Sequence, residues 1–367
     1  MKKELPLAGI QIKNFKAIQD SKLVKLTPLT IFIGNNGSGK SSIIEALETF
    51  QILALQGIDD AMQPWHGFEH IWGKANSHRN IKEKITNPMA FELRGRDAAE
   101  KFKCYLEVVS DVNFDRVYYQ SYKAAYASGD FIERPNFISD GEIADPQLKL
   151  FVRDWQFLKL NPFFMTEPMP QKRAYGSIKL DKTGSNIAEY LQSIRDLDIQ
   201  VFNGIFEALR VVLPFVVDLQ PAITSELDRK VYLTMSEENI AGKLAGWMLS
   251  TGTLRILALL SVLRHPEPSP VIIIEEIENG LDPRTIHLLV DEIRYFVETG
   301  RGQVIATTHS PYFLDLLKLS QIIVVEREES GTPVFTRPES KKSLEDWAQK
   351  FSPGKLYTMG KLSGAKR

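Results

Sequence analysis

A glycine-rich stretch near the start of the chain has the residue types and spacing of a phosphate-binding loop. Residues 34–41 read GNNGSGKS and match the pattern G-x-x-x-x-G-K-[ST]. They follow an apolar segment, LTIFI, and precede a segment in which Ile43, Ile44 and Leu47 repeat at helical spacing. Glycines let backbone N–H groups crowd around an anion, and the positive end of the helix dipole lies at the same place. The motif therefore predicts a site for a nucleoside triphosphate such as ATP.

Two residues at the end of this loop have specific expected roles. Lys40 would reach the terminal phosphates, and the Ser41 hydroxyl would be a ligand of Mg²⁺. The residues expected to bind the nucleotide are Asn35, Asn36, Gly37, Ser38, Gly39, Lys40, Ser41 and Ser42. The alternative, an ordinary glycine turn before a helix, is disfavoured by the strand-loop-helix context.

Two adjacent carboxylates follow a second apolar segment far downstream. Residues 271–274, VIII, have the composition of a buried central strand, and Glu275 and Glu276 come directly after it. At the carboxyl end of such a strand, Glu275 would hold Mg²⁺, while Glu276 would orient and deprotonate the attacking water. By themselves the two residues fit an acidic loop before a helix equally well. The phosphate loop upstream favours the catalytic interpretation.

A histidine follows a third apolar segment, QVIATT. His309 comes just after this expected strand, where a sensor of the γ-phosphate would lie, because an imidazole can hydrogen-bond a transferring phosphoryl group. The alternative is a structural histidine in the loop that Ser310 and Pro311 indicate.

These segments together resemble the ABC-type ATPase family, in its branch of soluble RecF-like and SMC-like heads. The order of motifs is the same: IKNFKAI, the phosphate loop, a signature at residues 249–253 (LSTGT), VIIIEE, the D-loop NGLDP with Asp282, and His309 as the switch histidine. LDKTGSNIAEYL and LYTMGKLSG resemble the OLD-related, stand-alone AAA-family ATPases of bacterial anti-phage operons. The resemblance implies an α/β P-loop NTPase fold, an ABC-type head with an antiparallel β subdomain and a helical lobe.

The resemblance also implies a homodimer that closes around two ATP molecules, and a higher oligomer is compatible with it. Ser250, Gly252 and the helix start that follows would contact the γ-phosphate of the nucleotide bound by the other subunit, because the phosphate loop already supplies one side. Asp282 would contribute to nucleotide binding. A capped core helix is the alternative for this stretch, and it holds from Leu254 onward in either case.

The chain departs from the family pattern in three places. Glu275 stands where most ABC proteins carry aspartate. The Q-loop glutamine stays open between Gln51, Gln56 and Gln63. The residues after His309 are too few for the TOPRIM-type nuclease of OLD-like relatives, so we expect any effector to be a separate protein.

Patterns along the chain predict how it is divided. Residues 1–135 and 260–330 would form the nucleotide-binding lobe, with antiparallel strands between about 91 and 126. Residues 136–259 would form the helical lobe carrying the signature, with Ser185 or Asn186 as a helix cap. Residues 331–367 would be a basic tail. No sustained heptads occur, so the long coiled-coil arms of SMC proteins are not expected.

Composition excludes several classes of protein. The 367 residues carry a formal net charge of −1, so the chain as a whole is not basic. Its one cysteine, Cys104, cannot form an internal disulfide, and the longest uninterrupted apolar run, ILALL, is far too short to span a membrane. The segment MKKELPLAGIQIKNF lacks the apolar core of a signal peptide. We therefore expect a cytoplasmic protein with no membrane partner.

Basic residues are gathered in two places, and either could contact DNA. One is the expected strand region and the other is the tail, where Trp347, Phe351 and Tyr357 are interleaved. Solvated surface is the alternative, because acidic residues lie among the basic ones. The basic residues of the strand region are Lys82, Lys84, Arg94, Arg96, Lys101 and Lys103; the acidic residues are Glu83, Asp97 and Glu100.

The sequence thus predicts an ATP- and Mg²⁺-dependent dimeric ATPase. The resemblance suggests the sensor or scaffold subunit of an anti-phage defence system, triggered by DNA or a phage protein. The main alternative is a RecF/SMC-like DNA-repair ATPase without a toxic partner, and a transporter nucleotide-binding subunit is a weaker one.

Overall fold

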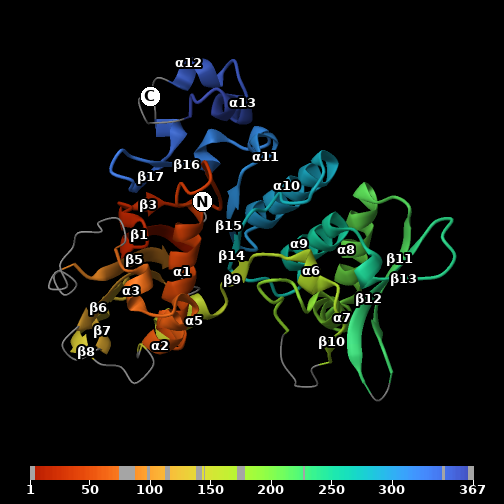
Figure 1. Ribbon diagram of the computed structural model, residues 1–367, viewed down its shortest axis with the longest axis horizontal. Helices are drawn as coiled ribbons and strands as arrows, with labels where there is room; N and C mark the ends of the chain where they lie inside the picture. The colour runs from red at the N-terminus through yellow and green to blue at the C-terminus, as the bar shows by residue number, and fades with distance from the viewer. Residues whose placement is uncertain are drawn as a thin grey trace. The chain divides into compact units, whose positions relative to one another are not determined.

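The computed structural model describes residues 5–73, 87–96, 100–111, 116–137, 143, 145–171, 178–225, 228–340 and 344–362. The chain forms two compact units, the first comprising Met1–Trp155 and Gln303–Arg367 and the second Gln156–Gly302. These boundaries differ from the expected lobes, because residues 136–155 belong to the first unit and residues 260–302 to the second. Figure 1 shows the elements in chain order, coloured from the N-terminus to the C-terminus.

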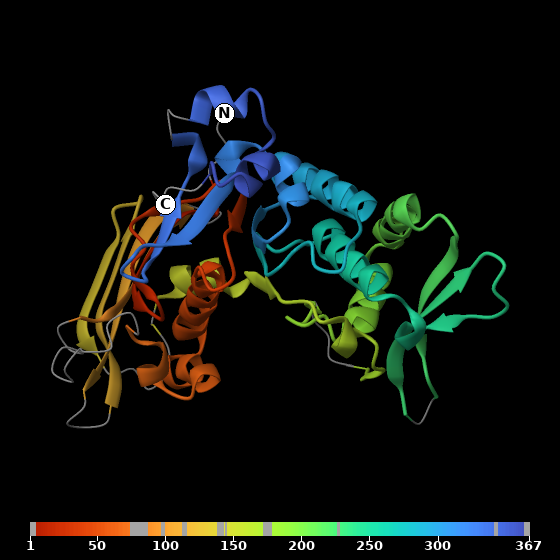
Figure 2. The ribbon, with the colours of Figure 1, turned by 45° about the horizontal axis from the view of Figure 1, so that its top comes forward.

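An antiparallel sheet forms one layer of the first unit, and it confirms the strands expected between residues 91 and 126. Its order is β2-β1-β5-β6-β7-β8, with β3 also paired to β1, and Figure 2 shows its long strands side by side. Phe50 of α1 packs against Phe91 of this sheet, with ring centroids 5.8 Å apart. The strands are β1 (Leu7–Phe15), β2 (Ile18–Asp20), β3 (Val24–Lys25), β5 (Met89–Arg96), β6 (Lys101–Asp111), β7 (Arg116–Tyr126) and β8 (Phe131–Phe137).

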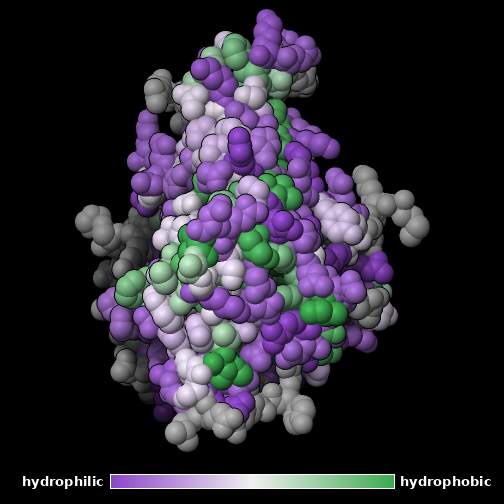
Figure 3. Space-filling model, turned by 90° about the vertical axis from the view of Figure 1, so that its right-hand side faces the viewer, coloured by the Kyte–Doolittle hydropathy of each residue, from purple (hydrophilic) through white to green (hydrophobic). Residues whose placement is uncertain are grey.

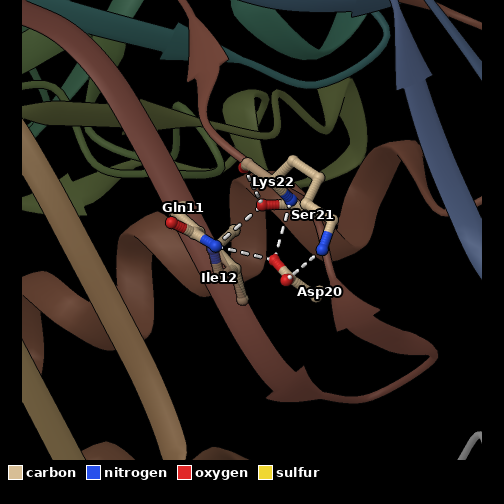
Figure 4. A network of polar contacts seen from close by, with 5 residues as sticks. All are labelled: Gln11, Ile12, Asp20, Ser21 and Lys22. Carbon is tan, nitrogen blue, oxygen red and sulfur yellow. Dashed lines mark hydrogen bonds and ion pairs between the residues drawn. The ribbon is translucent and has the colours of Figure 1, made fainter.

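A polar network closes the turn between β2 and β3 (Figure 4). Asp20 accepts hydrogen bonds from the Gln11 side chain and from the backbone N–H of Lys22, each at 2.8 Å, and it pairs with the Lys22 ammonium. Partial burial of the carboxyl opposes ionisation, but the bonds from Lys22 and Gln11 outweigh it and hold the pKa of Asp20 below its usual value. The network fixes the turn on which Lys22 adopts a left-handed backbone, with φ of 53°.

Parallel strands form the second layer of the first unit. β4 (Leu29–Ile33) lies between β15 (Gln303–Thr308) and β16 (Ile322–Arg327), and both pairings are parallel, while β17 (Pro333–Thr336) is antiparallel to β16. Every residue of β4 and β15 is buried, as their apolar composition predicts. The buried side chain of Gln303 bonds to the backbone N–H and C=O of Leu7, tying the two sheets together.

One long helix and several short ones complete the first unit. The long helix is α1 (Lys40–Leu55), which begins at the phosphate loop. The others are α2 (Ile58–Met62), η1 (Gln63–Trp65), α3 (Phe68–Ile71), α5 (Pro146–Arg153), α11 (Pro311–Asp315), η3 (Leu319–Gln321), η4 (Pro338–Ser340), α12 (Glu345–Ala348) and α13 (Pro353–Thr358).

The second unit is helical, as expected, but it also contains a hairpin that the sequence did not lead us to expect. β11 and β12 pair antiparallel, and Val216, Leu219, Val231 and Leu233 fill their buried face. The alternation of buried and exposed positions was obscured by a proline within β11 and by the charged turn. The elements are β9 (Gln156–Leu158), α6 (Pro162–Met165), β10 (Met169–Pro170), α7 (Ile187–Leu197), α8 (Ile199–Val212), β11 (Val216–Ile223), β12 (Lys230–Glu237), β13 (Leu244–Ala245), η2 (Gly246–Met248), α9 (Thr251–Arg264), β14 (Val271–Ile274) and α10 (Pro283–Glu298).

The helix α9 is the centre of the second unit. Every residue from Leu254 to Leu263 is buried, as expected of a helix that is apolar on all sides. Just before it, Trp247 and Met248 are 55% and 60% exposed. Figure 3 shows a face of the molecule on which apolar patches are separated by hydrophilic surface.

Neither Ser185 nor Asn186 caps α7 with its side chain, contrary to expectation. Asn186 occupies the N-cap position, but its side chain makes no capping bond. Instead, its amide accepts from the backbone N–H of Asp181 at 2.7 Å and donates to the carbonyl of Lys179 at 2.9 Å, which fastens the loop before the helix. Ser185 bonds to the Asp181 carboxylate. Within the described residues, no helix is long and apolar enough to cross a membrane.

Candidate nucleotide-binding site

The backbone of the phosphate loop requires glycine for steric reasons at two positions. A Cβ on Gly34 would lie 2.1 Å from the carbonyl oxygen of Val325, so the first residue after β4 cannot carry a side chain. Gly39 has φ of 111°, in the left-handed region, and a Cβ there would meet Pro333 Cγ at 2.7 Å. Both neighbours belong to β16 and β17, so these strands set the course of the loop.

The side chain of Lys40 is buried against the backbone of the phosphate loop. Its ammonium donates to the carbonyl oxygens of Gly34 at 2.7 Å and Asn35 at 2.9 Å, and the residue is only 5% exposed. A buried ammonium that bridges two carbonyls has little rotational freedom left to lose. The structure thus places the charge of Lys40 within the loop, against the carbonyls of Gly34 and Asn35.

The start of α1 has the properties of an anion site. Its N-cap is Gly39, no side chain caps it, and no acidic residue lies in its first turn. Ser41 and the loop residues Asn35, Asn36 and Gly37 are exposed, and Ser42 is half-buried. Ser38 is buried, and its hydroxyl has no hydrogen-bond partner within the described part of the chain.

A cavity of about 740 Å³ lies against the first half of the loop. Three segments of the first unit line it: loop residues 34–38, the end of β16 at residues 324–327, and residues 357–360 at the end of α13. The contribution of α13 was not predicted, because the tail carries no nucleotide-binding motif.

His309 lies at the same edge of the parallel strands as the phosphate loop. Thr308, the last residue of β15, is directly opposite Ile33, the last residue of β4. Gly34 and His309 therefore leave neighbouring parallel strands side by side. The next residue, Ser310, caps α11 by accepting from the backbone N–H of Phe313 at 3.1 Å.

The two carboxylates follow β14 in the second unit, and they differ from each other. Glu275 is buried and pairs with Lys159 at 3.0 Å, so its charge is already balanced by a cation. Glu276 is exposed and has a left-handed backbone with φ of 48°. Such a conformation costs a non-glycine residue about 1–2 kcal/mol and is found at functional sites more often than elsewhere.

Arg255 holds this backbone in place, and sequence reasoning missed it. Its guanidinium donates to the carbonyl oxygens of Glu276 at 2.8 Å and Leu160 at 2.6 Å from within the buried face of α9. Burial holds the pKa of Arg255 below its usual value, and the nearby carboxylates of Glu276 and Glu278 offset only part of this lowering. In the sequence, Arg255 is the one charged residue of the apolar run LRILALL, and this isolated charge could have indicated a buried polar role.

The signature residues make contacts within their own unit. The Ser250 hydroxyl caps α9 by accepting from the backbone N–H of Thr253 at 3.0 Å. A Cβ on Gly252 would lie 2.7 Å from the carbonyl oxygen of Gly280 in the D-loop. This packing gives Gly252 a structural reason to be glycine, in addition to the phosphate contact expected from the sequence.

Asp282 is the N-cap of α10. Its carboxylate accepts from the backbone N–H groups of Arg284 at 2.9 Å and Thr285 at 3.2 Å, and from the Thr285 hydroxyl. The Thr285 hydroxyl and these N–H groups together hold the pKa of Asp282 below its usual value. The structure thus gathers Ser250, Gly252 and Asp282 around α9 and the D-loop.

Of the three candidates for the Q-loop, Gln51 makes the clearest contacts. It lies inside α1 and donates to the carbonyl oxygens of Val152 and Trp155, which bind it to the end of α5. Gln56 is the C-cap of α1, and Gln63 is the first residue of η1. Groups of three or more metal-binding side chains are absent from the residues that the structure describes.

Two of the basic residues expected in the strand region, Arg94 and Lys103, form ion pairs with an acidic residue. Glu92 contacts both Arg94 at 2.7 Å and Lys103 at 3.3 Å. In the tail, the rings of Trp347 and Phe351 stack on each other, with centroids 5.7 Å apart. Lys82, Glu83, Lys84 and Asp97 lie outside the described residues.

Comparison with known proteins assigns the chain to a family. Residues 119–315, more than half of the chain, match the family described as "AAA domain, putative AbiEii toxin, Type IV TA system". The chain belongs to this family. Residues 7–103 of this AAA domain protein also match the family described as "AAA ATPase domain".

Solved structures place the AAA domain protein in the fold of SMC heads. An SMC head bound to the C-terminal winged-helix domain of ScpA aligns with 94% of this chain and 99% of its own, at 14% identity and a TM-score of 0.55. An SMC head with an extended coiled coil, bound to the C-terminal domain of ScpA from Pyrococcus furiosus, aligns with 94% of this chain and 99% of its own, at 13% identity and a TM-score of 0.52. The fold is therefore that of an ABC-type P-loop ATPase head.

A curated relative in sequence is an uncharacterized protein of Methanocaldococcus jannaschii. It is 28% identical over 162 residues, which cover 42% of this chain and 44% of the relative. The matched segment spans less than half of either protein.

Proposed function

We propose that this AAA domain protein binds and hydrolyses ATP, with Mg²⁺, as the closing dimer of an ABC-type ATPase. The observation that carries the proposal is the phosphate loop, in which Lys40 is buried against the carbonyls of Gly34 and Asn35 at the uncapped start of α1. A loop of this sequence, held in this conformation, is suited to a polyphosphate and to little else.

The residues for hydrolysis have separate roles. Mg²⁺ would neutralise phosphate charge, and the Ser41 hydroxyl and the Glu275 carboxylate would supply oxygen ligands of the kind that this ion prefers. Glu276 would orient the attacking water and accept its proton, because it is exposed whereas Glu275 is neutralised by Lys159. His309 would hydrogen-bond the γ-phosphate, since it follows the strand next to the phosphate loop.

Dimerisation would bring the signature of one subunit to the nucleotide of the other. Ser250 and the N-terminus of α9 would contact the γ-phosphate, and Asp282 would lie at the same interface. Trp247 and Met248, exposed just before Ser250, give this edge an apolar surface suited to contact with a second protein.

For the biological role, we propose a sensor or scaffold subunit in anti-phage defence that controls a separately encoded effector. The family description names a putative toxin of a type IV toxin–antitoxin system, and this supports a role in a defence system of two or more proteins. The SMC heads of the same fold were solved with a bound partner protein, which supports a head that works with another chain. DNA or a phage protein would be the trigger.

ATP titration of the full chain tests the nucleotide site. We expect Lys40→Ala to weaken ATP binding by about a hundredfold or more, because charge-assisted hydrogen bonds of about 1.5–3 kcal/mol each are lost. Lys25→Ala, which removes an exposed lysine from β3, is the control and should bind ATP like the parent. Tight ATP binding by Lys40→Ala would show that the loop is not the site.

A second experiment separates defence from DNA repair. Phosphate release is measured with and without DNA, with Glu276→Gln as the background control, and the chain is purified together with its genomic neighbour. A stable complex with the neighbour supports the effector proposal. DNA-stimulated hydrolysis without any such complex supports the repair alternative.

A further inference from the structure

The phosphate loop is held from outside by an arginine at the end of β16. Arg327 Nε donates to the carbonyl oxygen of Gly37 at 2.7 Å. Because the peptide bond is planar and trans, the direction of this carbonyl fixes the direction of the next N–H, that of Ser38. That N–H donates to the carbonyl of Asn35 at 3.1 Å, so the peptide is anchored at both of its polar atoms.

A second contact to the same half of the loop comes from α13. The Tyr357 hydroxyl donates to Asn35 Oδ1 at 3.4 Å, a long hydrogen bond. Residues 357–360 and loop residues 34–38 line the same cavity. Burial raises the pKa of Tyr357, so the hydroxyl stays protonated and able to donate at neutral pH.

The other end of α13 is seated on α11, the helix that begins two residues after His309. The backbone N–H of Gly354 donates to the Asp315 carboxylate at 2.6 Å. A Cβ on Gly354 would lie 1.9 Å from the carbonyl oxygen of Pro311, so the two helices approach backbone to backbone. One short helix therefore contacts both the phosphate loop and the segment that carries His309.

We propose that Arg327, Gly354 and Tyr357 form a brace that positions the nucleotide site. Arg327 and Tyr357 hold the first half of the phosphate loop in its binding conformation. Gly354 packs α13 against α11, so that the position of the phosphate loop relative to the segment carrying His309 is fixed. These are positioning residues, and the proposal rests on the proposed ATP site.

A role in stability alone makes a different prediction. If the brace only holds the C-terminal segment in place, its loss lowers the melting temperature and leaves the affinity for ATP unchanged. If it positions the loop, affinity falls even in variants whose melting temperature without nucleotide is close to that of the parent.

The test compares single substitutions in the full chain, each measured for ATP dissociation constant, KM, kcat and melting temperature. We expect Arg327→Ala to raise the ATP dissociation constant about tenfold, the equivalent of one lost charge-assisted hydrogen bond. Arg327→Lys should recover part of this loss, because an ammonium can still donate to the Gly37 carbonyl. Tyr357→Phe keeps the ring and should raise the constant only about twofold, as its hydrogen bond is long.

Gly354→Ala tests the contact with α11. We expect it to raise KM and lower kcat together, because α13 must move away from Pro311 and withdraw its support from both segments. Matched controls are Lys355→Ala, which changes an exposed side chain on the same helix, and Glu328→Gln, which changes the exposed neighbour of Arg327. Both should behave like the parent.

The outcomes are distinct. Unchanged ATP affinity in Arg327→Ala and Tyr357→Phe, with a lowered melting temperature, overturns the brace and leaves the ATP site intact. Failure of the parent chain itself to bind ATP overturns the proposed function and the brace with it.

Discussion

The phosphate loop of the first unit and the signature region of the second unit hold their polar groups in different ways. In the loop, Lys40 is buried against backbone carbonyls, and the glycines are imposed by neighbouring strands. In the signature region, Ser250 and Asp282 are helix caps, and Glu276 is exposed on a strained backbone held by Arg255. The polar groups of the loop are gathered around its own backbone at the start of α1, whereas those of the signature region stabilise the helices of the second unit.

A matched pair of glycine substitutions should separate the two regions most strongly. We expect Gly34→Ala to abolish ATP binding and to lower the free energy of unfolding by about 3 kcal/mol, because its Cβ meets a backbone carbonyl of β16. Gly252→Ala should keep the parental ATP affinity and lose hydrolysis, because it displaces the D-loop at Gly280. Calorimetric titration and urea unfolding measure both effects. Equal ATP affinity in the two variants would contradict the distinction.

Removal of Arg255 should give the next largest effect. Arg255→Ala leaves the carbonyls of Glu276 and Leu160 without their buried donor, which should cost about 2–3 kcal/mol of unfolding free energy. It also releases the backbone of Glu276, so kcat should fall while KM stays the same. Arg255→Lys, which can serve only one carbonyl well, should be intermediate. Steady-state kinetics with a parental kcat would show that the geometry of Glu276 is unimportant.

Substitutions of Ser250 separate its two roles. Ser250→Ala removes the cap of α9 and should cost about 1 kcal/mol of stability. Ser250→Asp keeps a good cap but places a negative charge where the partner's γ-phosphate is expected, so it should fold stably and fail to dimerise with ATP. Light scattering and thermal unfolding follow the two effects. An ATP-dependent dimer of Ser250→Asp would remove this residue from the interface.

The smallest effect is expected at Asp20, in the first unit but outside the loop. Its pKa is lowered in the folded state, so its contribution is present above the unfolded value near 3.9 and is lost as pH falls through the folded value. Asp20→Asn should therefore be less stable than the parent at pH 7 by about 0.5–1 kcal/mol. This difference should shrink in acid, and ATP affinity should not change. A constant difference down to pH 2 would contradict the charge assignment.

Local sequence patterns predicted the motif-bearing elements well. The apolar runs that became β4, β14 and β15, and the helix from Leu254, are buried on all sides, so composition alone indicated them. The hairpin of β11 and β12 was missed because its alternation is weak, and α13 because short helices are stabilised by tertiary contacts.

Side-chain roles that depend on distant partners could not be predicted. Nothing near Arg327 in sequence indicates the carbonyl of Gly37, and nothing near Glu275 indicates Lys159. The strained backbone of Glu276 is also invisible in sequence, since it depends on an arginine in another helix.

The mass of Glu276→Gln in the presence of Mg²⁺ and ATP tests the central claim most directly. The phosphate loop is intact in this variant and the proposed base is absent, so sedimentation should show a dimer that retains uncleaved ATP. Adding Ser250→Asp to the same chain should return it to a monomer that still binds ATP. Hydrolysis at the parental rate, or a monomer that holds ATP in the single variant, would contradict the account.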